Sequence, residues 1–205
     1  MRASLYFSTL LDSAGMSEHG LTHLDPLGRA RMVDVTPKEP THRRAIARCR
    51  VYMQPATTNM IASNAVLKGD VLAVARVAGI QAAKRTPALI PLCHQLTIGS
   101  VYVNFVIGDA DVEVEATVET VDRTGVEMEA MTACAVAALT IYDMVKSTDR
   151  SVFVSELALW EKAGGKSGGY RRRDPLVPPV APPAPVVRID DTDADDLWDD
   201  ADRAR

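Results

Sequence analysis

The stretch VEMEAMTACAVAALTIYDMVK, residues 126–146, decides how this chain folds. Most of its residues are small or apolar, so a helix formed by it must be buried on most sides. Charged side chains nevertheless stand near both ends, with Glu127 and Glu129 at the start and Asp143 and Lys146 at the finish. Buried charges have to be paired, hydrogen-bonded or used in chemistry. We therefore interpret this helix as a core element that also supplies half of an active site.

Asp143 and Lys146 are the strongest catalytic candidates in this helix. They are three positions apart, so they share one helix face and can reach each other or a common ligand. A carboxylate and an ammonium in a low-dielectric cleft have tunable pKa values, which proton-transfer chemistry requires. The alternative is a purely structural ion pair at a helix end, and the segment alone does not separate the two.

The residues before this helix predict a β-hairpin. Apolar and polar residues alternate over 101–107 and again over 112–119, with Gly108 and Asp109 between the two runs. Such alternation is typical of antiparallel strands with one packed face and one solvated face.

The other segments complete the pattern of an α+β fold, in which helices pack on one face of an antiparallel sheet. We expect strands at 45–53 and 152–161, helices at 56–66 and 70–84, and a proline-flanked loop at 87–91.

Capping residues mark the starts of two helices. Asp70 is expected to cap the helix at 70–84. The run Thr124-Gly125-Val126-Glu127 resembles a capping box, in which Glu127 serves the start of the long helix. On this interpretation Glu127 is structural, whereas Glu129 lacks a structural explanation.

Composition divides the chain into three parts. Residues 1–20 are expected to be a flexible leader, and residues 21–170 the folded domain. Residues 171–205 are expected to be a disordered tail, first proline-rich (PLVPPVAPPAPVV) and then acidic (IDDTDADDLWDDADRAR).

Charge and cysteine content exclude several functional classes. The net charge of −4 does not favour general nucleic-acid binding. The three cysteines form no CxxC pair, so neither a disulfide framework nor a cysteine zinc site is indicated, and no metal site is predicted. No run approaches the roughly 20 apolar residues of a membrane span. These features predict a cytoplasmic protein.

Two loops carry further candidate groups. Glycines surround Lys166, and they allow backbone N–H groups and the lysine to approach an anion. His94 is interpreted as a proton donor or phosphate ligand, and the adjacent Cys93 as a less favoured nucleophile. Lys68, Lys84 and Arg85 are further cations at loops or helix ends, where they can bind an anion.

The spacing of the charges in the long helix predicts an oligomer. Glu129 and Asp143 lie on nearly the same helix face, but roughly 21 Å apart along the axis at about 1.5 Å per residue. One small ligand cannot touch both within one chain. If both are functional, the site is shared across a symmetric subunit contact.

Several long motifs resemble the cyclic pyranopterin monophosphate synthase family of molybdenum-cofactor biosynthesis. The resemblance covers about residues 21–170. It rests on LTH (21–23), MVDV (32–35), KGDV (68–71), GIQAAKRTPALIPLCHQL (79–96), TGVEMEAMTACAVAALTIYDM (124–144) and GGKSG (164–168). Three positions depart from the family's usual residues: Gln95, Arg123 and Asn64, of which Asn64 lies in a turn and tolerates the left-handed conformation.

This resemblance implies a ferredoxin-like α+β fold and a homo-oligomer, a hexamer built as a trimer of dimers with active sites between subunits. It implies a lyase that converts (8S)-3′,8-cyclo-7,8-dihydroguanosine 5′-triphosphate to cyclic pyranopterin monophosphate with release of diphosphate. No cofactor is implied, although Mg²⁺ can accompany the triphosphate.

The resemblance also implies roles for individual residues. Asp143 is the implied catalytic acid/base and Lys146 its partner. The implied substrate-binding residues are Leu92, Cys93, His94, Met128, Glu129, Lys68, Lys166 and Arg43. Two other functions stay open from the residues alone: a non-catalytic nucleotide-binding protein on the same fold, and a scaffold whose tail recruits a partner.

Overall fold

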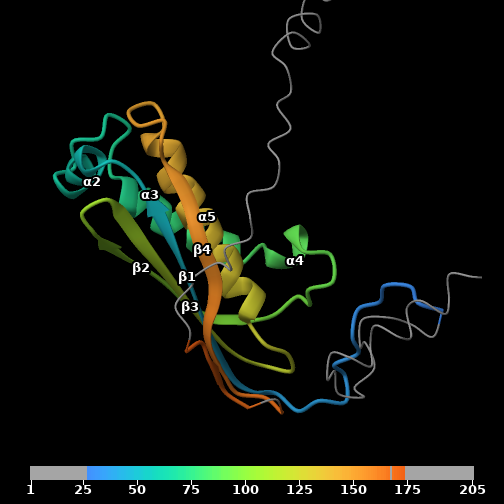
Figure 1. The fold of residues 1–205 in the computed structure, drawn as a ribbon. Coiled ribbons are helices and arrows are strands. Elements are labelled where there is room, and N and C mark those ends of the chain that lie inside the picture. The colour runs from blue at the N-terminus through green and yellow to red at the C-terminus, as the bar shows by residue number, and fades with distance from the viewer. Residues whose placement is uncertain (1–26, 167, 174–205) are drawn as a thin grey trace, which may run out of the picture. The chain divides into compact units, whose positions relative to one another are not determined.

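A computed structural model describes residues 27–166 and 168–173 (Figure 1). The expectations for the leader, and for the tail beyond residue 173, lie outside the described residues. The elements are β1 (Thr41–Tyr52), α2 (Pro55–Ala62), α3 (Val71–Ala83), α4 (Thr86–Leu89), β2 (Ile98–Ile107), β3 (Asp111–Asp122), α5 (Glu127–Val145), β4 (Phe153–Ala163) and β5 (Tyr170–Arg171).

The strands form one antiparallel sheet in the order β2-β3-β1-β4-β5. Helix α5 packs against β1, β3 and β4, and α3 packs against β2 and α5 (Figure 1). The order β1-α3-β2-β3-α5-β4 is that of a ferredoxin-like split β-α-β fold. The predicted α+β class, hairpin and strands are therefore confirmed.

Alternation along β1 explains why the helices cover one face of the sheet. Ala45, Ala47, Cys49 and Val51 are buried beneath the helices. The arginines between them point to the other face, where they pair with carboxylates of β3, as in the 2.6 Å contact of Arg48 with Glu115. Strand β1 thus contributes one apolar face and one charged face.

Helix α5 is the centre of the core, as its composition predicts. Four of its ten buried residues are alanines, and Ile141 is a large fully buried side chain. By length and composition alone α5 could cross a membrane, but half of its most apolar window is buried inside the domain. Packing on the sheet explains this apolarity.

Small residues let α3 approach α5 closely. Gly79 of α3 is buried, and a Cβ atom at this position would lie 2.9 Å from the Ala133 carbonyl oxygen and 3.1 Å from Val103 Cγ2. The glycine is therefore required by the contact between the helices, although glycine is a poor helix former.

Two predictions of local structure are confirmed. The Asp70 carboxylate caps α3 by accepting a hydrogen bond of 2.9 Å from the backbone N–H of Ala73. Asn64 adopts the left-handed conformation, with φ of 52°.

Two other local predictions are wrong. Residues Thr86–Leu89 form the short helix α4 instead of a loop, with Pro87 in the first turn, where its missing N–H is not needed. The capping box is not formed, because Val126 is the N-cap of α5 and no side chain caps it. The Glu127 carboxylate instead pairs with Lys162 of β4 at 3.2 Å.

Replacing Gly79 with alanine tests the close contact between α3 and α5. We expect Gly79→Ala to lower the free energy of unfolding by about 1–3 kcal/mol, because the added methyl overpacks the helix contact. Urea unfolding followed by circular dichroism measures it. Val77→Ala on the exposed face of α3 is the control, with an expected change within about 0.5 kcal/mol. A stability gain for Gly79→Ala would contradict the packing account.

Candidate active site

The C-terminal end of α5 carries a three-residue charge cluster. The Lys146 ammonium lies 2.6 Å from Asp143 Oδ1. Lys68, from the loop before α3, donates to the Asp143 backbone oxygen at 2.6 Å and lies 3.3 Å from Asp143 Oδ2. The predicted pair is therefore formed, and Lys68 joins it from a distant part of the sequence.

The electrostatics of this cluster differ from the expected low-dielectric cleft. Hydrogen bonds from Lys146 and Lys68 lower the pKa of Asp143, and the Asp143 carboxylate raises the pKa of Lys146. More than half of each of these two side chains is exposed. Within one chain, mutual stabilisation thus moves both pKa values away from neutrality, because it outweighs the opposing effect of burial.

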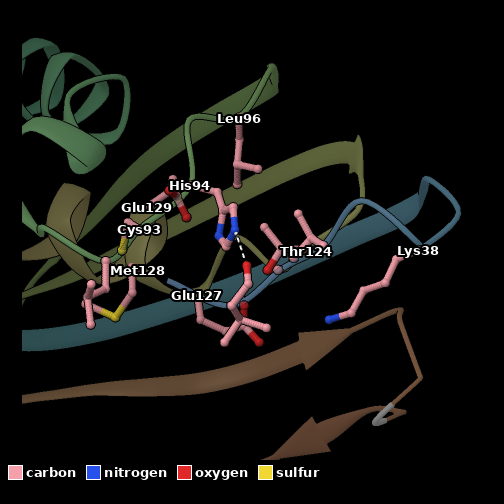
Figure 2. Close-up of a pocket in the computed structure, with 12 residues that line it drawn as sticks. Lys38, Cys93, His94, Leu96, Thr124, Glu127, Met128 and Glu129 are labelled. Atoms are coloured by element: carbon pink, nitrogen blue, oxygen red, sulfur yellow. Dashed lines mark hydrogen bonds between the residues drawn. The ribbon is translucent and has the colours of Figure 1, made fainter. Parts of the chain in front are cut away.

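The N-terminal end of α5 opens into a pocket of about 340 Å³ (Figure 2). The loop after α4 forms the opposite wall. Five predicted substrate-binding residues line the pocket together: Leu92, Cys93, His94, Met128 and Glu129. Segments 92–94 and 128–129, far apart in sequence, therefore belong to one site.

His94 links the pocket to the N-terminal segment of the domain. Its Nε2 lies 2.8 Å from the Val33 carbonyl oxygen, the contact drawn in Figure 2. A carbonyl can only accept, so Nε2 is the protonated nitrogen and Nδ1 is the acceptor in the neutral ring.

Glu129 is the most strongly perturbed acid of the pocket. Only 3% of the residue is exposed. Burial raises the pKa of Glu129 to about 7, and the charge of Glu127 acts in the same direction. Burial, together with the Glu129 charge, also raises the pKa of the Cys93 thiol. The site thus holds an acid that can exchange a proton near neutral pH, but it disfavours a Cys93 thiolate nucleophile.

A second pocket, of about 540 Å³, contains the predicted cations Arg43 and Lys166. Gly164 and Gly165 have φ of +93° and +77°, in the region that favours glycine. A Cβ atom on Gly165 would overlap the Arg43 guanidinium. This turn therefore brings Lys166 beside Arg43, whose Nε donates to the Asp122 carbonyl oxygen at 3.0 Å.

Lys38 is a candidate that the sequence did not reveal. It lines both pockets, and Figure 2 shows it on the side of the first pocket away from Cys93 and Met128. An isolated lysine carries no motif. The Arg123 guanidinium donates to the Thr36 carbonyl oxygen, two residues before Lys38 in the same turn.

Other predicted groups lie elsewhere. Lys84 and Arg85 are exposed at the end of α3 and line neither pocket. In residues 27–166 and 168–173, no three His, Cys, Asp or Glu side chains gather as metal ligands.

The charge cluster and the pockets are separated along α5. Glu129 and Asp143 both belong to this helix, and the 14 residues of separation correspond to about 21 Å at about 1.5 Å per residue. A ligand of nucleotide size cannot contact both groups in a single chain.

Comparison with known proteins adds to this geometry. The sequence profile of the MoaC family matches residues 32–165, which include every predicted site residue except Lys166. The chain is 58% identical over 156 residues to the cyclic pyranopterin monophosphate synthase of Thermomicrobium roseum, covering 75% of this chain and 94% of the relative. It is 52% identical over 162 residues to that of Streptomyces griseus, covering 79% and 92%. It is 54% identical over 167 residues to cyclic pyranopterin monophosphate synthase 3 of Mycobacterium bovis, covering 80% and 94%. The chain belongs to the MoaC family.

Proposed function

We propose that this chain is a cyclic pyranopterin monophosphate synthase of molybdenum-cofactor biosynthesis. It converts 3′,8-cyclo-7,8-dihydroguanosine 5′-triphosphate to cyclic pyranopterin monophosphate and diphosphate. The observation that carries the proposal is identity above half to synthases of that name over nearly their whole length. The charge cluster and the pockets at the ends of α5 supply groups that this chemistry needs.

In this proposal Asp143 and Lys146 transfer protons during the rearrangement, and Lys68 assists them. Ring opening and reclosure need both an acid and a base at the reacting atoms. The 2.6 Å contact supports direct proton exchange between the two groups. Excluding water disfavours the charged forms and moves both pKa values toward neutrality, so the proposal includes that substrate or another subunit covers the cluster.

In this proposal the two pockets bind chemically different parts of the substrate. The first, with its buried Glu129 and apolar walls, suits the purine-derived ring, to which a neutral carboxyl can donate. The second gathers Lys38, Arg43 and Lys166, which suit the triphosphate and the departing diphosphate. We propose no resident cofactor, and a Mg²⁺ ion that enters with the triphosphate would be bound by phosphate oxygens.

The separation of the two ends of α5 supports a shared active site. We propose that the charge cluster of one subunit faces the pockets of another, in a hexamer built as a trimer of dimers. Leu139 and Tyr142 are exposed large apolar side chains near Asp143, as a subunit contact requires. We propose that this biosynthetic enzyme acts in the cytoplasm.

Removing either member of the proton-transfer pair tests the activity. We expect Asp143→Asn and Lys146→Ala to fold and assemble but to lose at least about 10²-fold in turnover of the cyclised nucleotide, because each removes a proton-transfer group. Diphosphate and pterin formation measure it. Asp109→Asn, an exposed change in the β2–β3 turn, is the control that keeps activity. Normal turnover by both site variants would refute the mechanism.

Mixing variants tests the shared site. Lys146→Ala damages the charge cluster, and Lys166→Ala damages the anion pocket. If each site takes these groups from different subunits, co-expression restores about a quarter of wild-type activity, because one site in a mixed dimer is intact. Mixing Asp143→Asn with Lys146→Ala is the control without recovery. Absence of recovery in the first mixture would place both groups in one chain.

The Glu129 carboxyl predicts a pH dependence of stability. Its pKa rises from 4.5 to about 7 on folding, so the folded protein holds the proton more tightly. Wild-type stability should therefore fall by up to about 3 kcal/mol as pH rises from 4.5 to 7. Glu129→Gln cannot ionise, so its stability relative to wild type should increase over that interval and level off above it. Urea unfolding at several pH values measures this, and a flat difference would contradict the desolvation account.

A further inference from the structure

We propose that Asp149 is a positioning residue for the Lys68–Asp143–Lys146 cluster. Asp149 lies in the turn that follows α5, three residues after Lys146, and it hydrogen-bonds to the first turn of α2. The chain continues from α2 to Lys68. The inference rests on the proposed function for what the cluster does, but the connection itself is a property of the fold.

The Asp149 carboxylate is buried and fully used by donors. Its Oδ2 accepts from the Gln54 backbone N–H at 2.8 Å and from Thr57 Oγ1 at 3.0 Å. Its Oδ1 accepts from the Ser151 backbone N–H at 2.9 Å and from Ser151 Oγ at 2.6 Å. Only 3% of the residue is exposed. The Gln54 N–H and the Ser151 hydroxyl lower the pKa of Asp149 to about 2, so it acts as a fixed anion.

On one side, Asp149 is rigidly connected to Lys146. The Lys146 N–H continues the helix by donating to the Tyr142 oxygen at 2.9 Å. The N–H groups of Thr148 and Asp149 then both donate to the Val145 oxygen, at 2.9 and 3.0 Å. These overlapping turns leave little freedom between Lys146 and Asp149, so anchoring Asp149 fixes the backbone of Lys146.

On the other side, Asp149 supplies the cap that α2 lacks. Gln54 is the N-cap residue of α2, and its own side chain makes no capping bond. The Asp149 carboxylate accepts from the N–H of this N-cap residue and from the Thr57 hydroxyl, and its charge complements the positive end of the helix. Since α2 has only eight residues, it depends on such contacts for its order.

From α2, a short path leads to Lys68. The helix ends at Ala62, the chain turns through the left-handed Asn64, and Val66 is buried in the core. The Gly69 N–H closes the next turn on the Val66 oxygen at 3.0 Å, and Lys68 lies within it. The two lysines that contact Asp143 thus come from segments that both depend on Asp149.

Asp149→Asn tests this role in the full-length protein, against Val103→Ala as a control of general stability. Val103 is buried in β2, and its truncation destabilises the core without touching the cluster. We expect both variants to unfold at lower urea concentration than wild type. Only Asp149→Asn should lower kcat, by about 10- to 100-fold with KM changed less than about threefold, because small displacements of catalytic groups affect the transition state most.

A second readout does not depend on turnover. In protein labelled at the lysine side chains, NMR titration follows the Lys146 ammonium, whose pKa is raised by Asp143. We expect Asp149→Asn, but not Val103→Ala, to move that pKa back toward the free-lysine value. An unchanged Lys146 titration with a kcat equal to that of Val103→Ala would overturn the positioning role. Failure of wild type to make product would instead overturn the proposed function and leave the titration as the test of Asp149.

Discussion

The packing of α5 between α3 and the sheet is the constraint on which the rest of the structure depends. Alanines on α5 and Gly79 on α3 allow the helix backbones to approach until a single methyl would collide. Close packing of this kind holds a helix in one position, because small shifts forfeit dispersion contacts or create overlap. The charged residues at the two ends of α5 are therefore fixed relative to the sheet without being part of its core.

The two ends of α5 have opposite electrostatic character. At the N-terminal end, Glu129 loses water without gaining a cation, and its pKa rises. At the C-terminal end, Asp143 gains two ammonium groups while it stays more than half exposed, and its pKa falls. Desolvation and ion pairing have opposite effects on a carboxyl group, so one helix presents an acid that titrates near neutral pH and a firmly ionised one. This difference suits a reaction that combines ring chemistry with the handling of phosphates.

Much of this arrangement was predictable from local patterns. Period-two alternation identified the hairpin, and the strand expected at 45–53 is present as β1 (Thr41–Tyr52). The i,i+3 spacing identified the Asp143–Lys146 pair. The prediction of a capping box at Glu127 was wrong because the motif considers only residues close in sequence. The Glu127 carboxylate instead pairs with Lys162, which lies on a strand far along the chain. Lys38 and Asp149 gave no signal for the same reason, since neither belongs to a motif and both act through long-range contacts.

The amino-acid sequence by itself determined the α+β class, the central helix and the residue types available for catalysis, because these follow from periodicity and composition. The family resemblance also predicted which of these residues act together in one site. Only the tertiary structure decided that Cys93, His94 and Glu129 share one pocket, that Lys68 reaches Asp143, and that Asp149 connects α2 to the end of α5. Burial and hydrogen bonding between segments distant in sequence depend on how the helices and sheet pack, which no local pattern records.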